Sequence, residues 1–160
     1  MRSLSLLLGI CLSTSVFPTH ASFAETPSVP KASTAPLELS LLQNPKNVIT
    51  ANTISQRGLT IPSLWLAKEN SENKLLDNWI AYPVKKTEPG RVDLLVNQQL
   101  WSILDYSERY GFLNRVGTVA RRYGYNLRVF NYQKERLATY TCNFSISPVL
   151  CNVDLNSRTK

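Results

Sequence analysis

Residues 92–104 are Val92-Asp93-Leu94-Leu95-Val96-Asn97-Gln98-Gln99-Leu100-Trp101-Ser102-Ile103-Leu104, and they join a strand pattern directly to a helix pattern. The first five residues are mostly branched and apolar, which favours a buried strand. The side-chain oxygen of Asn97 can then accept one of the unpaired N–H groups at a helix start. Leu100, Ile103 and Leu104 recur at the spacing of one helical face, and Ser107 continues it. The stretch therefore predicts a strand followed at once by an amphipathic helix.

The residues before this stretch predict the first strand of a hairpin. Asn78-Trp79-Ile80-Ala81-Tyr82 is a short apolar run that ends before Pro83. Glu88-Pro89-Gly90 is a turn signal, so residues 92–96 form the second strand of the hairpin. Still earlier, Pro62 begins a helix pattern over residues 62–69, where its missing N–H is harmless in the first turn.

The residues after the stretch predict a second helix and a second hairpin. Gly111 is expected to stop the first helix, and Gly124 the second. The inner side of the second helix is expected to carry Phe112, Val116, Val119, Ala120 and Tyr123. Residues 126–131 and 137–144 alternate like paired strands, and residues 151–155 form a last short strand. The sequence thus predicts an α+β fold: a small antiparallel sheet of two hairpins plus an edge strand, with two or three helices packed on one face.

The N-terminus has the pattern of a cleavable secretory signal. Arg2 gives a positive start, residues 4–12 are largely apolar, and small residues end the segment at Ala24. Cleavage is expected after Ala24, with Ala21 as a variant. The apolar run is shorter than the roughly 20 residues of a membrane-spanning helix, which argues against an uncleaved anchor. A lipoprotein is disfavoured because Cys11 lies inside the apolar run.

Four segments are expected along the chain. Residues 1–24 are the signal peptide, and residues 25–58 are a disordered tether rich in Pro, Ser, Thr and Asn. Within that tether, the apolar patch at residues 37–42 can form a transient helix or dock on another surface. Residues 59–155 form a single α+β domain, and residues 156–160 form a C-terminal tail. The expected location is exported, in the periplasm or the thylakoid lumen.

Removal of the signal peptide would limit which side chains remain for catalysis and metal binding. It would delete His20, the one histidine, and would leave two cysteines, Cys142 and Cys151. Without histidine there is no Ser-His-Asp or Cys-His nucleophile and no histidine-ligated metal. No phosphate-loop or dinucleotide motif is present, so no cofactor and no metal site are predicted. An even cysteine pair in an exported chain predicts a Cys142–Cys151 disulfide, with a redox pair as the weaker alternative.

A basic, arginine-rich surface is a second candidate feature. The formal net charge of +7 falls by one, to +6, when the signal leaves with Arg2. Arg-Tyr-Gly-aromatic occurs twice, at residues 109–112 and 122–125. The structural interpretation makes each copy a helix end with a positive residue near the C-terminus. The functional interpretation is an anion-binding face, because arginine forks suit carboxylate, sulfate or phosphate. Its candidate members are Arg109, Arg115, Arg121, Arg122, Tyr123, Tyr125 and Arg128.

Carboxylate chemistry is the enzymatic alternative that remains once histidine-dependent and cofactor-dependent mechanisms are excluded. Asp77, Asp93, Asp105 and Glu108 are the acids in the structured part of the sequence, and Asp105 and Glu108 share a helix face. Two carboxylates suffice for a glycosidase. However, these two acids lie opposite the apolar stripe, as solvated helix acids do, so no catalytic residue is assigned.

Residues 92–106 (VDLLVNQQLWSILDY) and 123–131 (YGYNLRVFN) resemble a family of small exported cyanobacterial proteins of unknown function. The resemblance extends over most of residues 59–151. It implies a periplasmic or thylakoid-lumenal setting, and it implies no catalytic residue, cofactor or partner.

These observations favour an exported, non-enzymatic binding or assembly module that acts on a larger protein partner. The alternative partner is an anionic lipid or an acidic glycan, bound through the arginine–tyrosine face. Nucleic acid is not an expected partner, because the exported compartment holds little of it.

Overall fold

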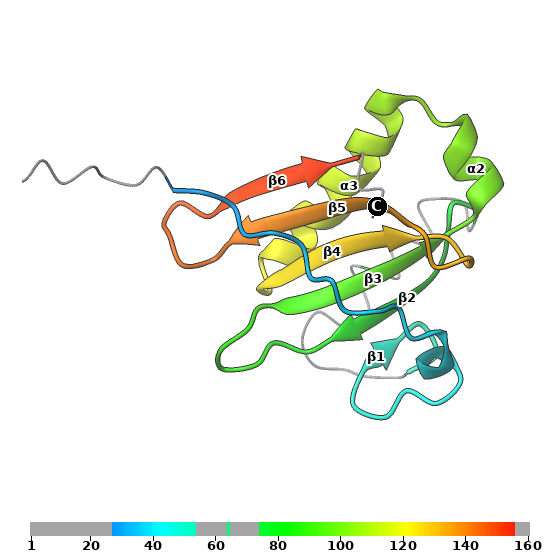
Figure 1. The fold of residues 1–160 in the computed structure, drawn as a ribbon, viewed down its shortest axis with the longest axis horizontal. Helices are drawn as coiled ribbons and strands as arrows, with labels where there is room; N and C mark the ends of the chain where they lie inside the picture. Colours follow the sequence, from blue (N-terminus) through cyan, green and yellow to red (C-terminus); the bar gives the residue numbers. More distant parts are fainter. Residues whose placement is uncertain (1–26, 54–63, 65–73, 156–160) are drawn as a thin grey trace, which may run out of the picture.

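The computed structural model describes residues 27–53, 64 and 74–155, and their main feature is a six-stranded sheet (Figure 1). The strands lie in the sheet in the order in which they occur along the chain. They are β1 (Ile49–Thr50), β2 (Leu76–Tyr82), β3 (Gly90–Val96), β4 (Tyr125–Phe130), β5 (Arg136–Asn143) and β6 (Leu150–Asp154).

The centre of the sheet is a parallel pair, β3 and β4. Val92 lies beside Leu127, and Leu94 lies beside Val129. All the other neighbouring strands are antiparallel. Two helices, α2 (Gln98–Ile103) and α3 (Tyr106–Arg121), connect β3 to β4 and return the chain to the end of the sheet where β3 began. Such a crossover is what parallel pairing requires.

This architecture corrects the predicted fold class. The α+β prediction of a small antiparallel sheet, with two or three helices on one face, is wrong. The sheet is mixed, it has six strands, and the described residues contain two α-helices, of which one is long. The hairpins β2–β3 and β4–β5 are present. The prediction was wrong about how the two hairpins are connected. The helical crossover from β3 to β4 makes these two strands pair in parallel.

The position of the helix break is a second correction. Gly111 does not stop a helix; it lies inside α3. The break occurs at Leu104, whose extended backbone (φ −66°, ψ 139°) ends α2. Gly124 does follow the end of α3, with a φ of 78° that favours glycine. The predicted helix at 62–69 lies outside the described residues except for Leu64, which is buried in the core.

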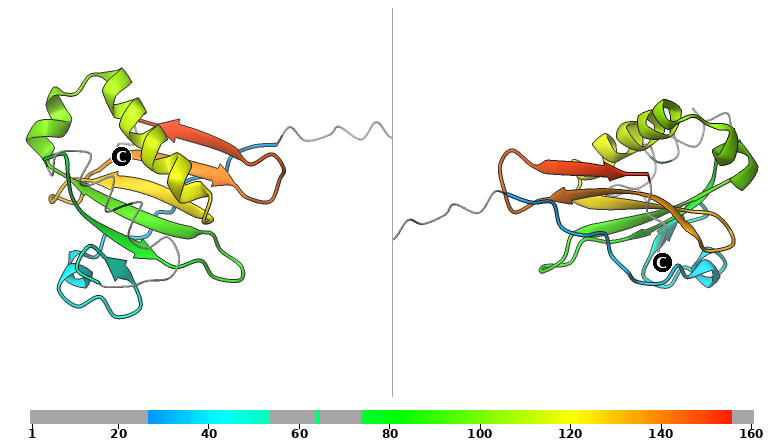
Figure 2. Two further views of the ribbon diagram at one scale, coloured as in Figure 1. Left: turned by 180° about the vertical axis from the view of Figure 1, so that it is seen from behind. Right: turned by 45° about the horizontal axis from the view of Figure 1, so that its top comes forward.

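One face of the sheet is covered by α3. Phe112, Leu113 and Val116 of that helix are buried in a single apolar cluster with strand residues that include Leu127 and Tyr140. The helix lies over the β4–β5 side of the sheet, as the view from behind shows (Figure 2). This face holds most of the buried apolar side chains.

The opposite face of the sheet is covered by residues 27–42, which we call the strap (Figures 1 and 2). The strap ends in a short 3-10 helix, η1 (Leu39–Leu42). Leu37 and Leu41 are buried against Ile80, Leu95 and Phe130. Residues 27–53 are therefore packed structure, which differs from the expected disordered tether.

The strap is also held by hydrogen bonds to its backbone. Arg128 donates from Nη1 to the carbonyl oxygens of Ser33 and Ala35, at 2.9 and 2.6 Å. Arg136 donates to the Ser33 carbonyl at 3.3 Å. Farther along the sheet, the side-chain amide of Asn143 donates to the strap carbonyl at residue 28, at 2.8 Å. Main-chain carbonyls accept these bonds, which add to the burial of the Leu37 and Leu41 side chains in holding the strap on the sheet.

Candidate binding site at the α2–α3 corner

The turn between α2 and α3 is fixed by local side-chain caps. Asn97 accepts a hydrogen bond from the backbone N–H of Leu100 at 3.1 Å, which confirms its predicted role at the start of α2. Asp105 accepts one from Glu108 N, and Glu108 accepts one from Asp105 N, both at 2.8 Å. This reciprocal capping box starts α3 immediately after α2 ends. The two helices therefore meet at a sharp corner (Figure 1).

Three large apolar side chains are exposed at this corner, and we call them the corner patch. Ile103 is 76% exposed, Tyr106 is 69% exposed and Tyr110 is 43% exposed. The rings of Tyr106 and Tyr110 stack with their centroids 6.4 Å apart. One exposed apolar residue is ordinary, but three of them, at the end of α2 and in the first two turns of α3, form a surface that water solvates poorly.

A cavity of about 380 Å³ lies beside the corner patch. It is open to solvent and is bounded by α2, α3, the start of β5 and the end of the described chain. Its lining residues are Gln98, Trp101, Ser102, Arg109, Arg136, Leu137 and Leu155. They include two arginines and no acid.

Arg109 joins the corner patch to the cavity. It lies on α3 between Tyr106 and Tyr110, and its guanidinium reaches back to the end of α2. Nε donates to the carbonyl oxygen of Trp101 and Nη2 donates to that of Ser102, both at 3.1 Å. The guanidinium carbon also lies 5.7 Å from the Trp101 ring centroid. These contacts satisfy helix-end carbonyls and fix the orientation of the guanidinium.

Two further residues shape the polar side of the cavity. Gln98 accepts a hydrogen bond at Oε1 from the side-chain amide of Asn131, at 3.1 Å. Arg136 points its Nη1 toward the strap, and its buried Nε has no hydrogen-bond partner in the structure. A buried unpaired donor is costly unless a ligand or a solvent molecule satisfies it.

The structure does not gather the seven predicted anion-binding residues on one face. Arg109 alone lines the cavity. Arg115 and Arg121 are exposed on α3, Arg122 follows the helix end, and Tyr123 is 48% exposed.

The last two members of that set serve the fold. Tyr125 is buried, and its ring lies where a side chain at Gly90 would be, 2.6 Å from an added Cβ. Arg128 is buried on the strap side of the sheet, where its Nε and Nη2 donate to both carboxylate oxygens of Asp93, at 2.7 Å each. Arg128 is therefore committed to an internal ion pair.

Sequence reasoning missed Gln98, Trp101 and Arg136 as site residues. The spacing of Trp101 and Arg109, eight residues apart across a helix break, gave no local signal. An Asp-x-x-Glu capping box at Asp105 and Glu108 would have placed the break and hence the corner.

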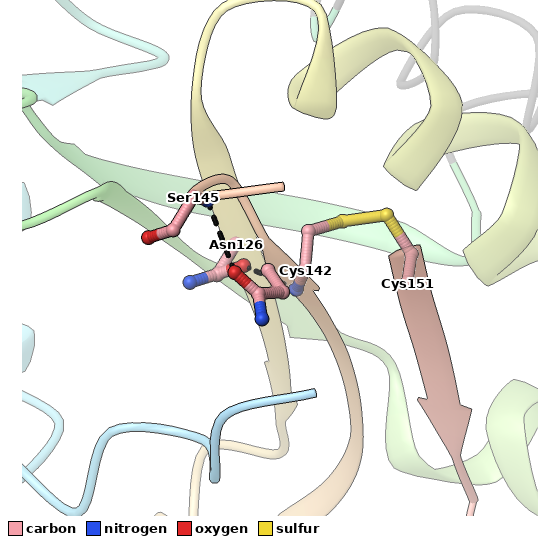
Figure 3. The surroundings of a disulfide bond; sticks show 5 residues. Asn126, Cys142, Ser145 and Cys151 are labelled. Atoms are coloured by element: carbon pink, nitrogen blue, oxygen red, sulfur yellow. Dashed lines mark hydrogen bonds between the residues drawn. A yellow bond between two sulfur atoms is a disulfide. The ribbon is translucent and has the colours of Figure 1, made fainter. Parts of the chain in front are cut away.

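The predicted disulfide is confirmed. Cys142 and Cys151 are directly opposed on β5 and β6, with sulfur atoms 2.03 Å apart (Figure 3). The backbone N–H of Cys142 donates to the side-chain oxygen of Asn126 at 2.8 Å (Figure 3). The disulfide thus links the outermost strand to its neighbour. It is compatible with an oxidising compartment.

The acids considered for hydrolysis do not form a facing pair in the described cavities. Asp105 and Glu108 are occupied by the capping box, and Asp93 is occupied by Arg128. Among the described residues, no acid lines the cavity at the corner, and Glu88 is the one acid that lines a second cavity of about 340 Å³. Within residues 27–53, 64 and 74–155, no three histidine, cysteine or acidic side chains are grouped to hold a metal ion. None of the helices in that part of the chain is long and apolar enough to span a membrane.

Comparisons with protein-family models, with curated proteins and with solved structures give no match to this chain.

Proposed function

We propose that this protein is an exported, non-enzymatic module that binds a larger protein partner through the corner patch. The observation that carries the proposal is the joint exposure of Ile103, Tyr106 and Tyr110 beside a cavity. Tyrosine and arginine are enriched where protein interfaces bind most tightly, and Arg109 lies among the three patch residues.

The rigidity of the corner supports this proposal. The caps at Asn97 and Asp105 and the anchored Arg109 fix the backbone on both sides of the patch. A preorganised surface loses less conformational entropy on binding than a loose one. Ile103 and Tyr106 have the largest exposed fractions among the large apolar side chains of the described residues.

Site-specific photo-crosslinking tests the proposal. A photoreactive phenylalanine analogue at position 106 should capture a discrete partner in periplasmic or lumenal fractions. The same analogue at Tyr132, which is 45% exposed on the β4–β5 loop, is the matched control and should not capture it. Ile103→Ser should reduce the yield at position 106 several-fold, because the few interface residues whose truncation costs more than about 1 kcal/mol lie near the centre of an interface. Equal capture at both positions, or an undiminished yield with Ile103→Ser, would count against the patch.

A second candidate is an anionic lipid or acidic glycan, bound at the end of the sheet where α3 finishes. Arg121 and Arg122 are exposed there, and Gly124 lies in the wall of the second cavity with Lys85 and Lys86. Lys85 lies 3.9 Å from the Glu88 carboxylate, and the remaining positive charge favours an anionic surface. Binding to anionic vesicles should weaken with salt and with the double substitution Arg121→Ala/Arg122→Ala. Vesicle binding that ignores both changes would rule out this candidate.

A further inference from the structure

The cavity at the α2–α3 corner has the composition of a site for a small anion with an apolar portion. Its two charged lining residues, Arg109 and Arg136, are both cations. Its other walls include the indole of Trp101 and the side chains of Leu137 and Leu155. Its volume of about 380 Å³ is at the lower end of the range for ligand sites.

We propose that this cavity binds a carboxylate that is attached to an apolar group. The proposal deepens the proposed function, on which it rests for the location of the site, and names the chemistry that the site recognises. The carboxylate pairs with the guanidinium of Arg109, and the apolar group packs on Trp101, Leu137 and Leu155. Two sources share this chemistry: a small free carboxylic acid, and the C-terminal residue of a polypeptide.

The geometry of Arg109 favours a carboxylate. Two of its N–H groups are held by the carbonyls of Trp101 and Ser102, and the remaining ones have no partner among the described residues. A guanidinium that is already oriented loses little freedom when it binds a planar carboxylate with two parallel hydrogen bonds. None of the described residues that line the cavity is acidic, so no carboxylate among them competes for this position.

Arg136 adds a second positive charge at the edge of the cavity, although its guanidinium is turned toward the strap. Its Nε is buried without a hydrogen-bond partner, although its Nη1 is bonded to the strap. A cationic ligand would meet positive charge and no negative charge among the described residues that line the cavity.

A titration followed by NMR tests the proposal, with N-acetyl-leucine and N-acetyl-leucinamide as probes. They differ in charge and share the apolar side chain. The acid should shift the indole N–H signal of Trp101 in a saturable way at millimolar concentration, and the amide should bind at least about tenfold more weakly. Inorganic phosphate, which lacks the apolar group, should also bind about tenfold more weakly than the acid.

Two variants distinguish the loss of a contact with the ligand from a general disturbance of the fold. Arg109→Lys keeps the charge and removes the guanidinium fork, and should weaken binding of the acid about tenfold. Ser102→Phe fills the cavity without changing its charge and should abolish binding. The matched control is Arg115→Lys, an exposed residue of α3 that lines neither cavity, and it should bind like the wild type.

The outcomes separate the two sources and separate this proposal from the proposed function. A leucine-ending peptide that binds more tightly than N-acetyl-leucine, and loses this on amidation, identifies a chain terminus; equal affinities identify a small acid. No saturable shift, or equal binding of acid and amide, overturns the carboxylate site. In both cases, crosslinking at position 106 remains a separate test of partner binding at the corner patch.

Discussion

Gly117 lies where α3 packs on β5, and its lack of a side chain allows the close approach. A Cβ built there would lie 2.5 Å from the ring of Tyr140, which is itself buried. We expect Gly117→Ala to lower the free energy of unfolding by about 1–3 kcal/mol, because the ring and the helix would have to move apart.

Gly111 is the matched control in the same helix. Its added Cβ would meet only the flexible end of Arg115, at 3.4 Å. Gly111→Ala should therefore raise the free energy of unfolding by about 0.5–1 kcal/mol, from helix propensity alone. Urea denaturation of both variants measures the two effects, and equal effects of the same sign would contradict the packing that we describe.

Tyr82 links stability to alkaline pH. Burial raises the pKa of its hydroxyl, the Asp93 carboxylate raises that pKa further, and Arg91 partly offsets the rise. Burial also raises the pKa of Tyr125, which the Val84 backbone partly offsets. A pKa that is higher in the folded than in the unfolded state stabilises the fold below the unfolded value. That contribution is lost as the pH rises through the folded value.

The free energy of unfolding should therefore fall between about pH 9 and pH 11, near the ordinary pKa of tyrosine. Tyr82→Phe and Tyr125→Phe should each make the fall shallower, and the double variant shallower still. Chemical denaturation at several pH values measures the slope. A slope that neither substitution changes would show that other groups cause the alkaline loss.

At the scale of elements, the corner depends on the capping box of α3. The Asp105 and Glu108 side chains satisfy backbone N–H groups that an uncapped helix would leave unpaired. We expect Asp105→Ala to lower the free energy of unfolding by about 1 kcal/mol. Ser107→Ala, at an exposed position in the same turn, should change it by at most about 0.5 kcal/mol. Thermal or urea unfolding compares them, and equal losses would contradict a specific cap.

The helix boundaries show how local signals compete. Asn97 predicted the start of α2, and the structure confirms it. The Asp-x-x-Glu pattern at residues 105–108 carries an equally local signal for α3, whereas Gly111 only weakens a helix. Once Leu104 is extended, glycine can remain in the helix interior because the packing of α3 on the sheet compensates for its propensity.

At the scale of the whole molecule, the strap makes the N-terminal segment part of the core. Leu37 is 4% exposed, although it lies in a stretch whose composition predicts disorder. We expect Leu37→Ala to lower the free energy of unfolding by about 2–4 kcal/mol. If this segment were a tether with no packing role, Leu37→Ala would leave the free energy of unfolding unchanged. Lys31→Ala, an exposed position of the strap, is the control and should stay within about 0.5 kcal/mol of the wild type.

The buried ion pair between Asp93 and Arg128 explains how the strap can cover a sheet face that carries charged side chains. Asp93 and Arg128 are 35 residues apart in the sequence and face each other across the parallel pair β3–β4. Arg128 uses its remaining donor group on strap carbonyls, so each charged group is paired and hydrogen-bonded. The sequence suggested an anion-binding role for Arg128, because its partner Asp93 can be identified only from the pairing of β3 with β4.

The sequence by itself determined the local features of this protein: strand and helix periodicity, the Asn97 cap, the glycine after α3 and the cysteine pair. Each depends on residues within a few positions, or on a count that compartment chemistry constrains. Only the tertiary structure decided which strands pair in parallel, which face the strap covers, and that Arg109 shares a cavity with Arg136 while Arg128 does not. Those outcomes depend on contacts between distant residues, whose energies arise only when the sheet forms and its two faces are buried.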